Sequence, residues 1–361
     1  MPLFLDAHQD LAWNMQLLGR DYRRSVHETR ALEVGSPILD LTGNTLLGLP
    51  EYNQAGVAWV FGTLFAAPFN PNNPNEQFPG YQSPTEAHQR YMSQLDFYHA
   101  YTSEHPDTYR LITKRSELHA HTDLWQPSND QLKPVGLIPL MEGAEGIISL
   151  DELPEWWQKG VRIIGLAWHG NPYCGGSRQP GPLTQAGHDL IDSMAEIGFV
   201  LDLSHMDESA AFQCLERYPG PIIASHANAS ALVKGYTGNR LLSNDLIRAM
   251  FQRDAVIGVI PSNPFLNQNW REDGGKSAIS LKLLANQIDY LCQMAGDARH
   301  VGIGTDFDGG FGVEDEPAEI DSIADLPKIL PLLSDFGYQN LDLEAIASGN
   351  FLRVLELALP E

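Results

Sequence analysis

Short apolar runs with the length of β-strands recur along the whole chain. Each run is almost continuously apolar and does not alternate with polar residues, which is typical of strands covered on both faces, as in a parallel sheet surrounded by helices. The runs occupy residues 3–8, 55–65, 134–143, 161–169, 198–205, 221–226, 255–262 and 300–309. The pattern therefore predicts eight parallel strands.

Amphipathic segments lie between these runs and predict helices. Residues 84–103 have a proline near the start and apolar side chains at helical spacing. Residues 243–253 begin with Ser243, a good helix N-cap, followed by an acidic first turn. Residues 280–294 and 342–357 are also amphipathic. Helices and strands therefore alternate along the chain.

This alternation predicts an α/β fold, a (β/α)8 TIM barrel, with a single domain over residues 1–361. An open doubly wound sheet is the alternative, but it would normally carry a glycine-rich phosphate loop after its first strand, and the sequence has none there. Three long irregular stretches, residues 68–84, 171–182 and 263–277, each follow the C-terminal end of a predicted strand. Barrels of this type build their functional sites at that face.

Composition and charge exclude several classes of partner. The sequence has 46 acidic and 23 basic side chains, so we expect no binding to nucleic acid or to an anionic membrane, because both require basic patches. The cysteines Cys174, Cys214 and Cys292 are far apart, so neither a disulfide framework nor a thiolate metal site is expected. We recognise no signal peptide, membrane anchor or membrane-spanning run, and we expect a cytoplasmic protein.

Side chains that can bind metal ions stand at the C-terminal ends of most predicted strands. They are His8, Asp10, Glu142, His169, His205, His226, Asp306 and Asp308. A single residue of this kind is usually a turn, cap or core residue. Buried His, Asp and Glu side chains are costly unless they are paired or bind a metal. The convergence of so many of them on one rim of a barrel therefore predicts a metal site.

The set is large enough for two ions. His8, Asp10, His205 and His226 offer four ligands, and Glu142 is a fifth whose carboxylate can bridge two ions. Two ions at bridging distance can hold a hydroxide between them and polarise a carbonyl, which suits hydrolysis.

A further carboxylate beside the ions could carry a proton to the leaving group. We choose Asp306 for this role because it lies nearer to the end of the last strand than Asp308 does. Asp308 also fits a turn residue before Gly309 and Gly310.

Six stretches, in order along nearly the whole chain, resemble motifs of the membrane dipeptidase (renal dipeptidase) family, peptidase family M19 of the amidohydrolase superfamily. They are DAHQDLAWN (6–14), LMEGAEGI (140–147), VLDLSH (200–205), IIASH (222–226), VGIGTDFDG (301–309) and GNFLRVLE (349–356). The resemblance implies a (β/α)8 barrel that cleaves dipeptides, often with a D-residue at the C-terminal position. It also suggests a homodimer.

The resemblance further implies two zinc ions and assigns their ligands. His8, Asp10 and Glu142 fall on the positions of one ion. Glu142, His205 and His226 fall on those of the other, with Glu142 bridging. Asp306 falls on the proton-handling aspartate.

Two candidate substrate-binding residues depart from the family pattern. The histidine that touches substrate after the family's fourth strand aligns with Trp168, and His169 takes the next place. His169 is therefore either a substrate contact or a loop residue, because neighbours on a strand face opposite ways. Arg240 lies in a segment that resembles the one holding the family's carboxylate-binding arginine. A surface arginine before a helix is the alternative.

Three functions remain open at this point. The first is a binuclear zinc dipeptidase that uses a bridging hydroxide. The second is a metal-dependent amidohydrolase of the same fold acting on another amide, a lactam or an N-acyl amino acid. The third is a non-catalytic barrel, which the full ligand set argues against. Nitrogen and oxygen ligands also suit manganese or iron. Trp156 and Trp157 belong either to an interface or to a helix core.

Overall fold

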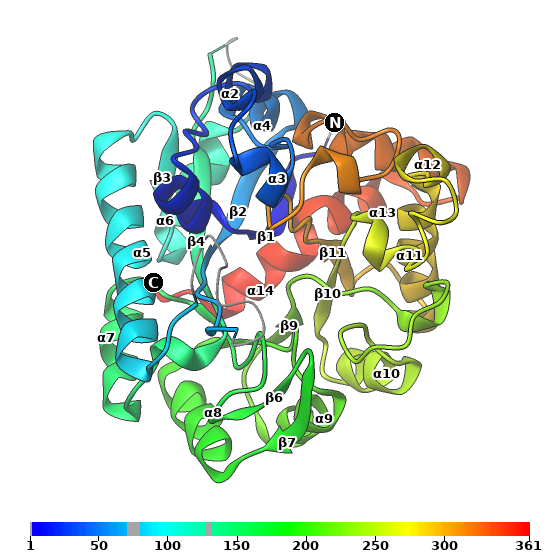
Figure 1. Ribbon diagram of the computed structural model, residues 1–361. Helices are drawn as coiled ribbons and strands as arrows, with labels where there is room; N and C mark the ends of the chain where they lie inside the picture. Colours follow the sequence, from blue (N-terminus) through cyan, green and yellow to red (C-terminus); the bar gives the residue numbers. More distant parts are fainter. Residues whose placement is uncertain (1, 71–79, 127–130) are drawn as a thin grey trace.

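The computed structural model describes residues 2–70, 80–126 and 131–361, and its eight main strands form a closed parallel barrel (Figure 1). The barrel strands are β1 (Phe4–Gln9), β2 (Val57–Leu64), β4 (Val135–Glu142), β5 (Ile163–Gly165), β8 (Val200–Asp202), β9 (Ile222–Ala224), β10 (Val256–Val259) and β11 (Val301–Ile303). Strand β1 pairs with β2 and β11, and β2 also pairs with β4, so the ring closes. The predicted TIM barrel is confirmed, and the open-sheet alternative is wrong.

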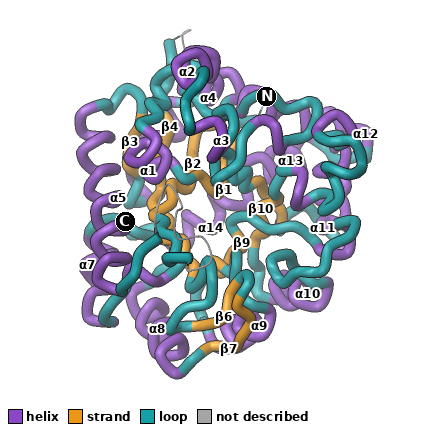
Figure 2. The backbone as a smooth tube through the Cα atoms, in the orientation of Figure 1, coloured by secondary structure: helices purple, strands orange, loops and turns teal. Residues whose placement is uncertain are grey.

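Helices surround the ring of strands (Figure 2). They are α1 (Leu11–Trp13), α2 (Val26–Glu33), α3 (Ile38–Thr42), α4 (Leu49–Ala55), α5 (Pro84–Glu104), α6 (Arg115–Leu124), α7 (Leu153–Gln158), α8 (Gln185–Ile197), α9 (Glu208–Arg217), α10 (Asn244–Gln252), α11 (Lys282–Ala295), α12 (Ile329–Asp335), α13 (Asn340–Glu344) and α14 (Asn350–Ala358). Within the described residues, no helix combines the length and the apolar character that crossing a membrane requires.

The four predicted helices are present as α5, α10, α11 and the pair α13–α14. Ser243 caps α10 as expected, because its hydroxyl accepts a hydrogen bond from the backbone N–H of Leu246 at 3.2 Å. The last predicted helix is continuous but contains a π-helical turn at Ala345–Gly349.

The predicted irregular stretches have different outcomes. Residues 171–182 are not irregular throughout, because they contain the antiparallel hairpin β6 (Cys174–Gly176) and β7 (Gln179–Leu183). Residues 263–277 consist mainly of turns, as expected. Most of the remaining stretch, residues 71–79, lies outside the described residues. The short strand β3 (Tyr109–Leu111), which the pattern did not predict, pairs with the start of β4.

The interior of the barrel is apolar toward the N-terminal ends of the strands. Leu5, Ile163 and Val256 are fully buried there with Phe351 of α14. The Phe351 ring contacts Phe61 edge-on, with centroids 5.5 Å apart. Figures 1 and 2 show α14 across the centre of the ring of strands. Helix α14 therefore closes one end of the barrel and leaves the loops at the C-terminal ends of the strands to form a site.

The two tryptophans of α7 belong to the core of the helical layer. Trp156 is completely buried. Trp157 packs edge-on against Phe199 at 5.0 Å, and the guanidinium of Arg162 lies 4.0 Å from the centre of its ring. Of the two interpretations of this segment, the structure supports the helix core.

Candidate active site

The five predicted metal ligands meet at the C-terminal mouth of the barrel. His8 and Glu142 lie at the C-terminal ends of β1 and β4, and Asp10 directly follows β1. His205 and His226 lie in the loops after β8 and β9. Most of these strands end earlier than the apolar runs suggested, so loop geometry as well as strand alternation orients the ligands. All five side chains nevertheless belong to one cluster, in which Glu142 is close to the other four.

Glu142 lies at the centre of this cluster. Its Oε1 is 3.1 Å from Nε2 of His205 and 3.6 Å from Nε2 of His226. Its Oε2 is 3.5 Å from Nε2 of His8. The two carboxylate oxygens therefore face different histidines, which is the arrangement that a bridging carboxylate needs.

The cluster contains two triads that match the predicted ligand sets. The ligand atoms of His8, Asp10 and Glu142 lie within 4.8 Å of one another, and so do those of Glu142, His205 and His226. Glu142 belongs to both triads. The geometry thus reproduces the grouping that the motifs suggest.

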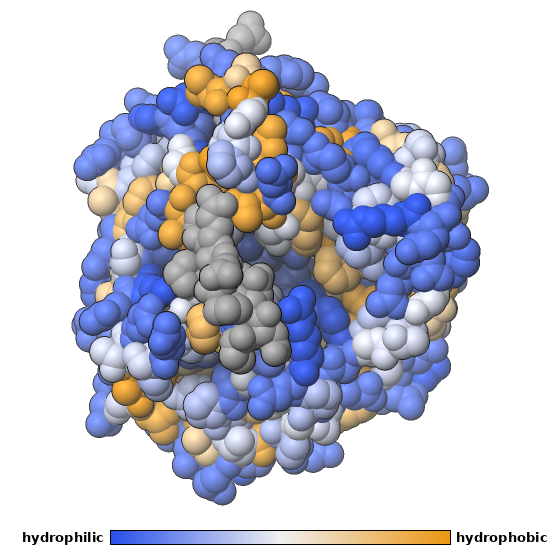
Figure 3. Space-filling model, viewed as in Figure 1, coloured by the Kyte–Doolittle hydropathy of each residue, from blue (hydrophilic) through white to orange (hydrophobic). Residues whose placement is uncertain are grey.

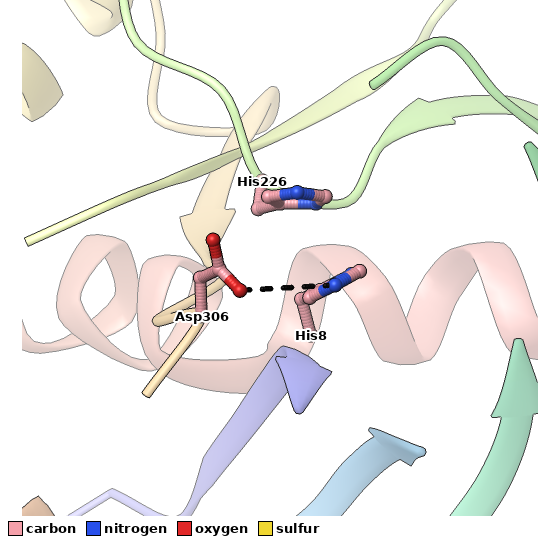
Figure 4. Close-up of side chains that lie close together, drawn as sticks. All are labelled: His8, His226 and Asp306. Carbon is pink, nitrogen blue, oxygen red and sulfur yellow. Dashed lines mark ion pairs between the residues drawn. The ribbon is translucent and has the colours of Figure 1, made fainter. Parts of the chain in front are cut away.

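Asp306 also lies in this cluster, whereas Asp308 does not. A third triad joins Asp306 to His8 and His226 within the same 4.8 Å limit. Figure 4 shows the Asp306 carboxylate directed toward His8, with the His226 ring above it. The distance from Asp306 Oδ1 to His8 Nε2 is 3.9 Å. Asp306 is therefore close enough to exchange protons with a group bound at the cluster, or to act as a ligand itself.

Asp308 is fully buried in a separate network. Its Oδ2 accepts hydrogen bonds from the hydroxyls of Tyr22 at 2.8 Å and Thr45 at 2.5 Å. The guanidinium of Arg20 lies 3.3 Å from the same oxygen. Asp308 thus ties the segment after β1 to the turn that carries Asp306, which is a more specific role than that of a simple turn residue.

Three of these residues have left-handed backbone conformations, which are uncommon for residues other than glycine. The φ angles are +65° at His205, +59° at Asp306 and +63° at Asp308. Each such residue costs of order 1–3 kcal/mol and persists where its surroundings enforce it. These backbone turns send Asp306 and Asp308 in different directions.

The cluster carries acidic groups whose burial is only partly compensated by positive charge, which comes from Arg240 and His8. Burial raises the pKa of Glu142 to about 8, and burial together with the neighbouring Glu142 raises the pKa of Asp10 to about 6. Burial also lowers the pKa of His205 and His226 well below 6.5, so both rings are neutral and can act as ligands. A bound cation would supply the missing compensation.

Hydroxyl groups orient the histidine rings. The Ser225 hydroxyl donates to Asp202 at 2.5 Å, so it accepts a hydrogen bond from Nδ1 of His226 at 2.9 Å. Ser177 Oγ lies 3.1 Å from Nδ1 of His205. Both contacts leave Nε2 facing the cluster, as a metal ligand requires. Sequence reasoning missed both serines, although Ser225 directly precedes His226 in its motif; Ser177 is distant from His205 in sequence and gave no such signal.

A cavity of about 680 Å³ lies above the cluster, within the usual size range for small-molecule sites. Its floor includes Asp10, Glu142 and Asp306, and both Trp168 and His169 line its wall. Figure 3 shows a hollow near the centre of this face, bordered by both hydrophobic and hydrophilic residues. Both alternatives for the substrate contact after β5 are therefore placed at the cavity.

Arg240 also lines the cavity and is not an ordinary surface arginine. Its Nη2 donates to the backbone oxygen of His226 at 2.7 Å. Its Nε and Nη1 atoms are buried and have no hydrogen-bond partner among the described residues. Arg240 thus combines two buried donors that lack an acceptor with a position in the cavity wall, where a ligand could provide an acceptor for the guanidinium.

The closed parallel barrel and the cluster of histidines and carboxylates at its mouth define a metal-dependent hydrolase of the amidohydrolase fold. Residues 1–359 match the family model for membrane dipeptidase, peptidase family M19. The chain belongs to this family of metallo-dipeptidases, as the sequence motifs suggested.

Individual proteins are similar to the chain at moderate to low identity. A Klebsiella pneumoniae protein, "Uncharacterized protein in pqqA 5'region", is 34% identical over 62% of this chain and 82% of its own length. Dipeptidase aclJ of Aspergillus oryzae is 26% identical over 79% of this chain and 63% of its own length. A metallo peptidase structure from Rhodobacter sphaeroides, liganded with a phosphinate mimic of L-Ala-D-Ala, covers 99% of both chains at 20% identity with a TM-score of 0.77, and it supports the fold.

Proposed function

We propose that the protein hydrolyses dipeptides with the help of two divalent metal ions, of which zinc suits the ligands best. The two triads that share Glu142 carry this proposal, because they offer two adjacent sites with one bridging carboxylate. When bound, such ions polarise the carbonyl of the scissile amide and make water a stronger nucleophile.

The residues of the cluster fit metal ions in their present arrangement. Nε2 of His8 is buried without a hydrogen-bond partner, although its neighbours Glu142 and Asp306 lie within 4 Å. Since buried polar atoms are nearly always satisfied, this atom is available for a ligand bond. His8, Asp10 and Glu142 would hold one ion, and Glu142, His205 and His226 the other.

Arg240 would bind the carboxylate of the substrate. Its buried Nε and Nη1 groups have no partner among the described residues, and a carboxylate would accept a charge-assisted hydrogen bond from this guanidinium. Substrates without a free carboxylate beside the scissile bond would leave these donors unsatisfied. We therefore expect a restriction to short peptides.

Asp306 would move the proton during the reaction. Water adds to the amide carbon, the C–N bond breaks, and the departing nitrogen needs a proton. Burial raises the pKa of Asp306 well above its ordinary value, which helps this carboxyl group to hold a proton between the two steps. Its position at the floor of the cavity gives it access to both atoms.

A D-residue at the C-terminal position is part of the proposal. It is supported by the Rhodobacter sphaeroides metallo peptidase of the same fold, which binds a mimic of L-Ala-D-Ala. A panel of L-L and L-D dipeptides therefore includes the expected substrates.

The test measures metal content and dipeptide hydrolysis on the same preparation. We expect two ions per chain by elemental analysis, loss of hydrolysis on chelation and recovery when zinc is restored. Manganese and iron, restored separately, identify the metal that supports the highest kcat/KM.

Other results would change the proposal in defined ways. Two ions without dipeptide hydrolysis would move the substrate to another amide, a lactam or an N-acyl amino acid. One ion per chain in fully active protein would contradict the binuclear site. Full activity in metal-free protein would contradict metal dependence.

A further inference from the structure

Arg178 is a second cation at the rim of the cavity that also contains Arg240. It is the second residue of the tight turn between β6 and β7 and has a left-handed backbone, with φ of +76°. Its guanidinium carbon lies 5.6 Å from the centre of the Trp168 ring, which forms part of the cavity wall. A cation–π contact with Trp168 therefore holds the Arg178 side chain beside the cavity.

The backbone that carries Arg178 is held in place on two sides. On one side, the N–H of Ser177 donates to the backbone oxygen of His205 at 2.7 Å. On the other side, the side chain of Asn239 donates to the oxygen of Gly176 at 3.1 Å and accepts from the N–H of Arg178 at 3.4 Å. The hairpin is thus bonded to a candidate metal ligand and to the residue that precedes Arg240.

Arg178 forms no ion pair with a carboxylate within residues 2–70, 80–126 and 131–361. The absence of an acidic partner is unexpected in a chain with 46 acidic and 23 basic side chains, because carboxylates outnumber the cations that they can pair with. Arg271 provides a contrast, since it also lies over a tryptophan, at 4.5 Å from Trp270, but pairs with Asp315 at 3.0 Å. Trp270 and Arg271 do not line the cavity.

We infer that Arg178 selects dipeptides whose C-terminal residue has an acidic side chain, aspartate or glutamate. The inference rests on the proposed dipeptidase function, in which Arg240 binds the α-carboxylate of that residue. Arg178 and Arg240 line the same cavity, and the Arg178 hairpin is bonded to the residue next to Arg240, so a second carboxylate on the same substrate residue would face the Arg178 guanidinium. A charge-assisted pair of this kind distinguishes a carboxylate from an amide of the same shape.

The experiment compares substrates that differ only in this charge. For metal-loaded protein, we expect kcat/KM for Ala-Glu to exceed that for Ala-Gln about tenfold, the effect of one hydrogen-bonded charge. The same ratio is measured with the L and the D isomer of the C-terminal residue. Glu-Ala and Gln-Ala, which move the charge to the other residue, should be cleaved at similar rates.

Three variants assign the preference to one side chain. In Arg178→Gln the Ala-Glu to Ala-Gln ratio should fall to about one, and in Arg178→Lys part of it should remain. Arg271→Gln is the matched control and should keep the wild-type ratio. Calorimetric binding of phosphinate mimics of Ala-Glu and Ala-Gln should show the same differences without turnover.

Two results would overturn the inference, and they are distinguishable from failure of the proposed function. Equal rates for Ala-Glu and Ala-Gln in wild-type protein would remove the acidic preference while dipeptidase activity stands. If the Arg178→Gln variant kept the preference for Ala-Glu over Ala-Gln, another residue would be responsible for that preference. If no dipeptide is cleaved and no phosphinate mimic binds, the proposed function and this inference both fail.

Discussion

The two ends of the barrel differ sharply in what they bury. At the C-terminal mouth, three histidines and the carboxylates of Asp10, Glu142 and Asp306 lie together with little exposure. At the N-terminal end, the interior contains aliphatic and aromatic side chains closed off by Phe351 of α14. The mouth therefore carries buried polar groups that favour unfolding unless they bind something, whereas the opposite end carries apolar burial that favours folding.

This difference separates the residues that make the fold stable from those that make it a candidate enzyme. In barrels of this type, residues at the C-terminal face serve the reaction and residues at the opposite face serve stability. Left-handed backbone at His205 and Asp306 further lowers the stability of the folded state at the mouth. Substitutions at the two ends should therefore affect different measurements.

The largest effect should follow Glu142→Gln, which keeps the shape of the side chain but removes the bridging carboxylate. We expect loss of bound metal and a fall in kcat/KM on the order of 10³-fold. The free energy of unfolding of metal-free protein should change by less than about 1 kcal/mol, because burial raises the pKa of Glu142 to about 8 and the carboxyl is largely neutral at pH 7. Elemental analysis, kinetics and denaturant titration measure the three quantities.

Glu145→Gln is the matched control for that substitution. Glu145 has nearly the same exposure, 7% against 6%, but belongs to none of the three triads. The metal content of the Glu145→Gln variant should equal that of the wild type. If Glu142→Gln retained two ions, Glu142 would not be the shared ligand.

Phe351→Ala should have the opposite profile, since it acts at the apolar end. Removing a fully buried phenylalanine from a packed core should lower the free energy of unfolding by about 3–5 kcal/mol. Metal content and kcat/KM per folded molecule should remain close to those of the wild type. Leu357→Ala, on the exposed face of the same helix, should change stability by less than about 0.5 kcal/mol. A large loss of kcat/KM in folded Phe351→Ala protein would show that the two ends are not independent.

The sequence alone predicts the mouth better than the opposite end. The ligands follow apolar runs, and parallel strands bring their C-terminal ends together, so His205 and His226 could be grouped without a structure. The apolar face of residues 342–357 predicts burial of that helix, but the pattern does not specify the barrel interior as its partner.

Backbone direction after the strands explains most of what sequence reasoning missed. Asp306 and Asp308 lie two residues apart, and their separation into two networks depends on left-handed backbone that no side-chain pattern reveals. Ser177 and Arg178 reach the cavity only because residues 171–182 fold into a hairpin.

The smallest predicted effect concerns His121, a titratable residue near the apolar N-terminal end of the barrel. It tests whether this end, as well as the C-terminal mouth, contributes to the pH dependence of stability. Nε2 of His121 donates to the backbone oxygen of Ala58, at the start of the barrel, at 2.9 Å. Its Nδ1 is buried without a partner, and burial lowers the pKa of the ring from 6.5 to about 4. Protonation would place a charge in an apolar site with no compensating group.

Because the pKa of His121 is lower in the folded than in the unfolded protein, its contribution to stability is fully present above pH 6.5 and is lost as the pH falls toward 4. The loss should reach about 3 kcal/mol at most. Urea titrations between pH 4 and 7 should show that His121→Gln, whose amide can still donate to Ala58, removes this part of the wild-type pH dependence. His27→Gln, at an exposed position on α2, should keep it. Parallel pH profiles for wild type and His121→Gln would mean that His121 does not titrate with folding, and that the acid sensitivity belongs to the mouth.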